Sequence, residues 1–197
     1  MEFFHKNLKL IVHTSVYPPS EDSIMLANAA EFAHGNVLEI GCGSGIVSLC
    51  AASNPKNTVL GVDINQDAVQ CAIKNAKNNQ ITNVHFIESD LFSSVEGKFD
   101  TIMFNPPYLP TSHEERISGS INHAFDGGED GRKIVDRFLD EFGNYQKPKG
   151  VLLLVQSSLN DLEKTITKLK KLGYQVDIIN EEKFFFEKLY LIMATKN

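Results

Sequence analysis

Cysteine is scarce in this sequence, and its spacing disfavours two kinds of architecture. Only three of the 197 residues are cysteines, namely Cys42, Cys50 and Cys71. They form no Cys-x-x-Cys pair and their number is odd, so neither a disulfide framework nor a zinc site is indicated, and we expect reduced, half-buried thiols. His113 and His123 lie ten residues apart without cysteine partners, and we predict no metal site.

Long apolar runs and a surplus of basic residues are also missing. No apolar run approaches the roughly 20 residues of a membrane span, and residues 1–6 lack the layout of a signal peptide. We therefore expect a cytoplasmic protein without a membrane contact. The formal net charge is −6, and only three of the 19 basic residues are arginines. This balance disfavours duplex binding by a broad basic face and leaves a local basic patch open.

The remaining composition indicates a globular protein in which strands and helices alternate. Hydrophobic residues make up 42% of the chain, enough for a full core without cross-links. Apolar, β-branched runs predict strands, after an apolar segment at 8–12, over 36–40, 58–62, 84–87, 99–104 and 150–156. Helices are predicted from a cap at Ser20 to about Phe32, over 46–52, 67–77 and 131–142, and up to Leu172. The alternation predicts a parallel α/β sheet in one domain over residues 1–197, with a short extension over about residues 1–20.

The second half of the chain adds three further expectations. Residues 109–129 show little periodicity and are interpreted as a long functional loop. Asn160 and Glu163 are expected to cap the helix that Gly173 ends. Two apolar runs, 174–179 and 189–194, are joined by a charged aromatic turn, which predicts a hairpin with one antiparallel strand.

The turn of that hairpin contains three consecutive aromatic residues, Phe184, Phe185 and Phe186. We interpret them as the edge of the core. If they are exposed, they could instead form a partner interface.

A glycine-rich turn follows the first predicted strand of the sheet. Gly41, Gly43 and Gly45 precede a helix, and Asp63 ends the next strand 22 residues after Gly41. In open α/β sheets this layout binds a nucleotide, with the carboxylate accepting from the ribose hydroxyls. Ile46 stands where a dinucleotide fingerprint has its last glycine, so a pyrophosphate is disfavoured. A nucleoside with a compact zwitterionic tail fits better, and S-adenosylmethionine has this form.

Two further carboxylates are expected at the same edge. Glu39 lies in an apolar run, where burial would require hydrogen-bond partners. It either caps the glycine turn or orients it and accepts a hydrogen bond from the amino-acid end of the cofactor. Asp90 could accept from an adenine amino group while Leu91 packs on the ring, or it is a solvated loop carboxylate.

The segment Asn105-Pro106-Pro107-Tyr108 ends the strand 99–104, since two prolines cannot continue a ladder. A planar NH2 group is a poor nucleophile because its lone pair is delocalised. The Asn105 side-chain oxygen and the Pro106 carbonyl could each accept one of its hydrogens and turn the lone pair toward a methyl donor. Pro106 and Pro107 would fix the backbone, and Tyr108 offers a flat face for a planar substrate group.

Three motifs together resemble class I S-adenosylmethionine-dependent methyltransferases of the amino-methylating NPPY group. They are VLEIGCGSG at 37–45, GVDIN at 61–65 and FNPPY at 104–108. Two more, YPPSEDS at 17–23 and AFDGGEDGR at 124–132, resemble the HemK-like family that methylates the glutamine of the GGQ loop in peptide-chain release factors. The resemblance covers nearly the whole chain. It implies a Rossmann-like fold with a mostly parallel twisted sheet, one antiparallel strand and helices on both faces.

The resemblance also implies the site residues, the cofactor and the partners. S-adenosyl-L-methionine would be converted to S-adenosyl-L-homocysteine, and Asn105 would bridge this cofactor and the substrate glutamine within the catalytic segment that Pro106, Pro107 and Tyr108 complete. The implied cofactor contacts are Ser23, Glu39, Gly41, Gly43, Asp63, Ile64, Asp90, Leu91 and Asn105.

The motif that begins near residue 18 leads us to expect no N-terminal helical domain like that of the bacterial members. The chain also departs from the family motif, since Pro18 stands where Glu is more frequent. In length it is similar to the archaeal and eukaryotic type, whose members work with a small zinc-binding activator protein.

Two other functions compete with this interpretation. The same four residues suit an adenine or guanine amino group of DNA or RNA, but such enzymes usually carry a recognition module and a basic groove, which this sequence lacks. A non-catalytic cofactor-binding protein has no need for the acceptor geometry of Asn105 and Tyr108. Turnover of the cofactor on an amide substrate would distinguish these alternatives.

Overall fold

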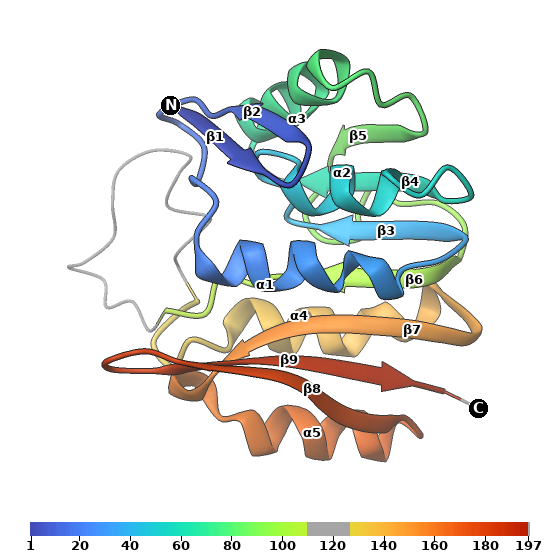
Figure 1. Ribbon diagram of the computed structural model, residues 1–197. Helices are drawn as coiled ribbons and strands as arrows, with labels where there is room; N and C mark the ends of the chain where they lie inside the picture. Colours follow the sequence, from blue (N-terminus) through green and yellow to red (C-terminus); the bar gives the residue numbers. More distant parts are fainter. Residues whose placement is uncertain (110–126, 197) are drawn as a thin grey trace.

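The computed structural model describes residues 1–109 and 127–196, and its centre is a seven-stranded sheet with the order β5-β4-β3-β6-β7-β9-β8 (Figure 1). The first five strands of this order run parallel to their neighbours. Strand β9 is antiparallel to β7 and to β8. The prediction of a mostly parallel sheet with one antiparallel strand is therefore confirmed. The strands are β3 (Asn36–Ile40), β4 (Thr58–Asp63), β5 (Val84–Glu88), β6 (Phe99–Phe104), β7 (Gln146–Ser157), β8 (Gln175–Lys183) and β9 (Lys188–Thr195).

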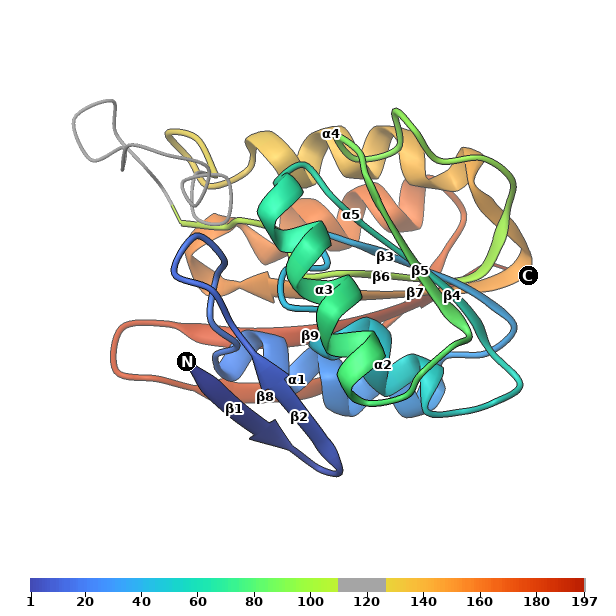
Figure 2. The same cartoon turned by 90° about the horizontal axis from the view of Figure 1, so that it is seen from above.

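Helices cover both faces of the sheet, as the resemblance implied (Figure 2). One face carries α1 (Glu21–Ala29), α2 (Ile46–Ala52) and α3 (Gln66–Asn78), and the other carries α4 (Lys133–Glu141) and α5 (Leu162–Lys171). Three short 3-10 turns extend these elements: η1 (Ala30–Phe32), η3 (Phe142–Asn144) and η4 (Ser158–Asn160). No helix in the described ranges is long and apolar enough to cross a membrane.

The core has two layers because the central strands are apolar on both faces. On β7, Leu153 and Val155 point into the cluster below α1, α2 and α3, whereas Leu152 and Leu154 join the cluster below α4 and α5. All four side chains are fully buried. A continuous apolar run is typical of a parallel strand covered on both sides, which explains why the sequence predicts these strands well.

The N-terminal residues form a separate two-stranded sheet, which the sequence did not predict beyond the apolar segment 8–12. Strands β1 (Glu2–His5) and β2 (Leu8–Ile11) pair antiparallel. Two asparagines of α3 hold β2 against the body, since Asn75 Oδ1 accepts from the Ile11 amide at 2.8 Å and Asn79 Oδ1 from the Lys9 amide at 3.0 Å. The alternation on β1 is between exposed and half-buried side chains, so its strand signal is weak.

Two predicted helix caps are wrong. Ser20 precedes α1 but makes no side-chain cap bond, because its hydroxyl donates to the adjacent Glu21 carboxylate instead. Helix α5 is capped by Asp161, whose Oδ1 accepts from the Lys164 amide at 3.0 Å. Asn160 lies in η4 and donates its side-chain amide to a backbone carbonyl.

The predicted ends of other elements were partly right. Gly173 ends α5 with φ +87°, as expected. The α-helical part of the first helix ends at Ala29, before the predicted Phe32. The 3-10 turn η1 then continues it to Phe32. Strand β7 starts at Gln146 rather than Gly150, and α4 starts at Lys133 rather than Gly131. Most of the predicted loop 109–129, with His113 and His123, lies outside the described residues.

Candidate active site

A cavity of about 360 Å³ opens at the carboxyl edge of the parallel strands. The elements around it are α1, the turns after β3, β4, β5 and β6, and the start of α4. The cavity brings together nearly all predicted site residues, namely Ser23, Glu39, Gly41, Gly43, Asp63, Ile64, Asp90, Leu91, Asn105, Pro106 and Pro107. Tyr108, which follows them, lies beside the cavity and reaches one of its walls through a hydrogen bond described below.

The glycine turn requires glycine for conformation and for space. Gly41, Gly43 and Gly45 all have positive φ angles, at +69°, +52° and +86°. Residues other than glycine rarely adopt such backbone angles. A Cβ on Gly43 would meet no atom within 4 Å, so the backbone there borders open cavity. A Cβ on Gly45 would lie only 3.0 Å from the Cβ of Ala72. Glycine at this position therefore allows the start of α2 to pack closely against α3. Gly41 faces the backbone carbonyl of Asn105, 3.9 Å from the position of its missing Cβ.

Asp63 ties the glycine turn to the end of β4. Its Oδ2 accepts from the Gly43 amide and its Oδ1 from the Asn65 amide, both at 2.9 Å. A carboxylate can accept more than two hydrogen bonds, so these contacts are compatible with the predicted ribose contact. Ile64 is 42% exposed and presents an apolar side chain to the same cavity.

Glu39 is buried at the end of β3 and is held from α2. One of its oxygens accepts from the Ser48 amide at 2.8 Å and from the Ser48 hydroxyl. Burial raises the pKa of Glu39 to about 8, although both Ser48 contacts favour the charged form. The carboxyl group thus caps the start of α2 and also lines the cavity; its contact with the cofactor stays a prediction.

The turn after β5 is bound to helix α4. Asp90 Oδ2 lies 3.0 Å from Arg137 Nη2 in an ion pair in which both side chains are nearly half exposed. Leu91 is buried with φ +49°, and its carbonyl accepts from the Ser89 hydroxyl at 2.9 Å. The sequence did not predict that Arg137 and Lys133 line the cavity. Their spacing of four residues on one helix face was the available signal.

The Asn105-Pro106-Pro107-Tyr108 segment leaves an acceptor without a partner. The Oδ1 atom of Asn105 is buried and makes no hydrogen bond to any described residue. A buried polar atom of this kind is costly unless another molecule satisfies it. Pro106 is buried and Pro107 half-buried, and neither has an N–H group to compete for acceptors.

A cluster of hydroxyl groups around Asp22 connects Tyr108 to the cavity. Asp22 is 5% exposed and lies in the first turn of α1. Its carboxylate accepts from the Ser23 amide at 2.6 Å and the Ser23 hydroxyl at 3.1 Å, and more weakly from Tyr17 at 3.4 Å and Tyr108 at 3.4 Å. Burial and the nearby Asp22 charge both raise the pKa of the Tyr17 and Tyr108 hydroxyls. Asp22 and Tyr17 were quoted in a motif but not predicted as site residues.

Residues 127–132, the described part of the second family motif, pack behind Tyr108. A Cβ on Gly131 would lie 2.4 Å from the Tyr108 carbonyl oxygen, so only glycine allows this approach. The Gly131 carbonyl accepts from the Asn160 side chain at 3.1 Å. Arg132 is buried and donates to the Asp161 carbonyl at 2.9 Å and to Asp136 at 2.7 Å. This motif therefore supports the Asn-Pro-Pro-Tyr segment from outside the cavity. Residues 124–126 lie outside the described residues.

No group of three or more His, Cys, Asp or Glu side chains that could hold a metal ion occurs within residues 1–109 and 127–196. The three cysteines are free thiols, and burial raises the pKa of each.

Comparisons with known proteins place these features in a family. Residues 21–186 match the model of the methyltransferase small domain. A Methanocaldococcus jannaschii protein named "Putative protein N5-glutamine methyltransferase MJ0928" is 50% identical over 96% of both chains. Methyltransferase HEMK2 of Homo sapiens is 31% identical over 98% of this chain and 96% of its own.

The similarity extends to a solved structure. Mtq2 of E. cuniculi, determined in complex with Trm112 and described as responsible for methylating the termination factor eRF1, superposes with a TM-score of 0.72. It is 26% identical, and the match covers 93% of this chain and 100% of that one. With the glycine turn, Asp63 and the Asn-Pro-Pro-Tyr segment at one cavity, the chain belongs to the HemK2/Mtq2-type family of S-adenosylmethionine-dependent release factor glutamine methyltransferases.

Proposed function

We propose that this protein methylates the side-chain amide nitrogen of the glutamine in the GGQ loop of a peptide-chain release factor, using S-adenosyl-L-methionine and releasing S-adenosyl-L-homocysteine. The observation that carries the proposal is the buried Asn105 Oδ1, which has no partner in the described chain and lies in a segment that faces the glycine turn. An NH2 donor from a substrate would satisfy this acceptor.

The residues of the cavity fit the proposed cofactor. Gly43 exposes its backbone to open space, Asp63 stands at the end of β4 for the ribose, and Ile64 and Leu91 supply apolar contacts for a base. When bound, S-adenosylmethionine supplies a methyl group carried on a positively charged sulfur. The carboxylates of Asp22 and Asp63 give this region the opposite charge. The Asp90 carboxylate forms an ion pair with Arg137 through Oδ2. We infer that a hydrogen bond from the adenine amino group is accepted by carboxylate lone pairs that do not contact Arg137.

The acceptor residues would activate the glutamine amide by position. Asn105 Oδ1 and the Pro106 carbonyl each accept one amide hydrogen, and this directs the nitrogen lone pair at the methyl group. The N–CH3 bond forms as the S–CH3 bond breaks, and the nitrogen then loses one proton to water. No general base is required before transfer, because the nitrogen becomes acidic only once it is methylated. Tyr108 would pack on the planar amide.

A protein substrate is favoured over nucleic acid by the formal net charge of the chain, which is −6. We further propose that a small zinc-binding activator protein binds this chain, because the Mtq2 relative was solved in complex with Trm112. We expect the activity in the cytoplasm, where free thiols stay reduced.

The decisive experiment follows the label from methyl-labelled S-adenosylmethionine. The substrates are a release factor with a GGQ loop, its Gln→Ala variant, and mixed DNA and RNA, each with and without a zinc-binding activator. Label on the intact release factor and not on the variant supports the proposal. Label on nucleic acid alone overturns the substrate and retains the methyltransferase. Binding of the cofactor without product on any substrate would indicate a non-catalytic protein.

A further inference from the structure

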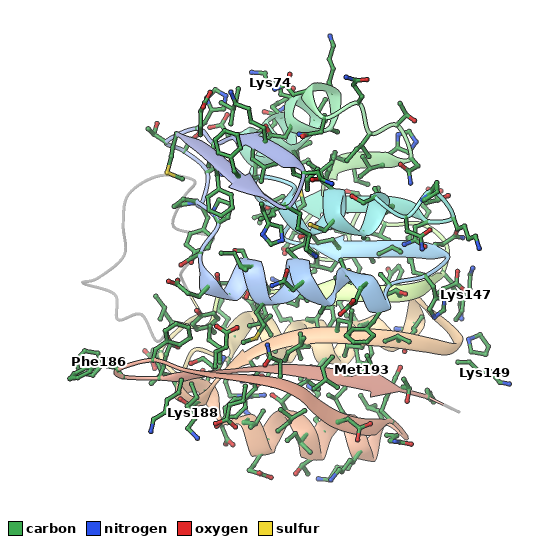
Figure 3. All side chains as sticks on the ribbon, in the orientation of Figure 1. Lys74, Lys147, Lys149, Phe186, Lys188 and Met193 are labelled. Carbon is green, nitrogen blue, oxygen red and sulfur yellow. The ribbon has the colours of Figure 1, made fainter. Side chains whose placement is uncertain are left out.

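The tip of the β8–β9 hairpin presents two exposed aromatic rings at the same edge of the sheet as the active site. Phe185 and Phe186 are 92% and 85% exposed, and their rings meet edge to face with centroids 4.6 Å apart. Figure 3 shows Phe186 projecting from the end of the hairpin, away from the body of the protein. Two large apolar side chains so fully exposed are unfavourable in water, which makes them candidates for a contact.

The strand register fixes where this tip lies. Phe104, which precedes the catalytic segment, pairs with Leu154 of β7, and Ser157 at the end of β7 pairs with Leu189 of β9. Because β9 begins where β7 ends, the turn 184–187 projects beyond the carboxyl edge of the sheet, where the cavity opens. The rings therefore stand at the same edge of the sheet as the candidate active site.

Three contacts hold the tip in place beside Tyr108. Glu187 accepts from the Ser157 hydroxyl at 2.7 Å, and the Phe184 amide donates to the Glu187 carbonyl at 2.8 Å. Phe184 turns inward and packs against the core cluster that Tyr108 also contacts. The charge of Glu187 contributes to raising the pKa of the Tyr108 hydroxyl, which places Glu187 near the catalytic segment. The tip is thus anchored on one side and exposed on the other.

The charges around the rings favour a protein over a polyanion. Glu181, Glu182 and Glu187 outnumber Lys183 and Lys188, and Lys188 is paired with Glu181 at 2.7 Å. Exposed aromatic rings can also stack on nucleic acid bases, but such sites are accompanied by an uncompensated basic groove. A surface that is apolar in the centre and acidic at its border complements an apolar patch with basic residues around it.

We propose that Phe185 and Phe186 dock the substrate protein itself, on an apolar patch bordered by basic residues next to its glutamine loop. This inference rests on the proposed function and names a specificity element of the same site. Under the proposed function the cavity takes the cofactor and the glutamine side chain, so recognition of the rest of the substrate protein would come from surfaces beside the cavity. A rigid aromatic pair is suited to this role, because it loses little side-chain entropy on binding.

The test compares the variant Phe185→Ser/Phe186→Ser with the wild type on two substrates, the intact release factor and a short peptide with the same glutamine, with the activator present throughout. For the intact protein we expect the KM to rise about tenfold or more with little change in kcat. For the peptide, which does not reach the tip, both parameters should stay unchanged. Phe185→Leu/Phe186→Leu should recover part of the loss, and Phe4→Ser, at another exposed aromatic, should have no effect.

The outcomes separate the inference from the proposed function. If the wild type methylates the release factor and the serine variant keeps its KM, the docking role is overturned while the proposed function stands. If the wild type methylates no release factor, the proposed function fails and the docking role with it. A loss confined to nucleic acid methylation, or a change from dimer to monomer on gel filtration, would assign the rings to a different partner and overturn the inference.

Discussion

The half of the cavity that we propose for the cofactor (the cofactor half, with Glu39 and Asp63) and the half that we propose for the substrate amide (the acceptor half, with Asn105 and the adjoining Tyr108) differ in how completely their polar groups are satisfied. In the cofactor half, carboxyl oxygens of Glu39 and Asp63 accept from backbone amides at 2.8 and 2.9 Å. In the acceptor half, Asn105 Oδ1 has no partner in the described chain, and Tyr108 reaches Asp22 only at 3.4 Å. The first half is shaped by the protein alone. The second keeps hydrogen-bonding capacity for a substrate, which is expected where chemistry depends on the bound acceptor.

The largest effect should come from removing the unsatisfied acceptor. For Asn105→Ala we expect methyl transfer to fall on the order of a hundredfold or more, because one of two acceptors of the amide hydrogens is lost. Affinity for the cofactor product should change only modestly. Single-turnover kinetics with labelled cofactor and calorimetry with S-adenosylhomocysteine measure the two quantities. Unchanged turnover would remove Asn105 from the catalytic role.

The substitution Asp63→Ala, in the cofactor half, should weaken cofactor binding more than it lowers the rate of methyl transfer. Asp63→Ala removes the carboxylate that holds the Gly43 amide and is expected to accept from the ribose. Hydrogen bonds to charged groups contribute about 1.5–3 kcal/mol, so we expect cofactor affinity to fall roughly tenfold to a hundredfold. The rate at saturating cofactor should fall much less. Asp67→Ala, at an exposed carboxylate in the first turn of α3, is the control. Equal affinities in the two variants would contradict the contact.

The buried carboxyl of Glu39 gives the cofactor half a pH dependence. Its pKa of about 8 in the folded protein lies above the ordinary value of 4.5, so the folded state holds a proton that the unfolded state has lost between these limits. Stability from this group therefore falls as the pH rises from 4.5 to about 8, by at most about 1.4 kcal/mol per pH unit. Glu39→Gln should flatten this slope in urea unfolding. Parallel curves for wild type and variant would show that Glu39 is ionised throughout.

The smallest effect is expected from the weak contact of the acceptor half. Tyr108→Phe keeps the ring and loses only the 3.4 Å hydrogen bond to Asp22. We expect a roughly twofold to fivefold decrease in kcat/KM. Tyr108→Ala also removes the aromatic face and should raise the KM for the substrate protein further. If the Phe and Ala variants behave alike, the hydroxyl rather than the ring is what matters.

The sequence predicted those parts of the fold that are buried on both faces. Strands β3 and β6 and helix α2 have the predicted bounds, because a continuous apolar run or a run of small residues leaves little freedom. Strand β1 was missed, since its side chains alternate only between exposed and half-buried. The caps failed where neighbouring polar residues compete, as Glu21 does for the Ser20 hydroxyl.

The predicted site residues were found along contiguous motifs. Of the missed ones, Asp22 was quoted in a motif without a role, and Arg137 lies outside the motifs. Asp22 and Arg137 join the cavity only because α1 and α4 pack at its rim. Their positions depend on how elements distant in sequence meet. The four-residue spacing of Lys133 and Arg137 indicates only that the two side chains share a helix face. The sequence also could not predict that Asn105 Oδ1 is buried without a hydrogen-bond partner among the described residues, because this depends on the surrounding packing.

The position of β9 between β7 and β8 has a consequence for how the protein reaches its native state. Strand β9, the last segment of the sheet, must insert between β7 and β8, which precede it in sequence. Neither β7 nor β8 can therefore form its hydrogen bonds with β9 until residues 188–195 are available. During synthesis, the backbone edge of β7 that pairs with β9 stays without its partner strand until residues 188–195 emerge. The turn 184–187 can take its place beside Tyr108 only after this insertion. The surface beside the candidate active site is therefore completed late in folding.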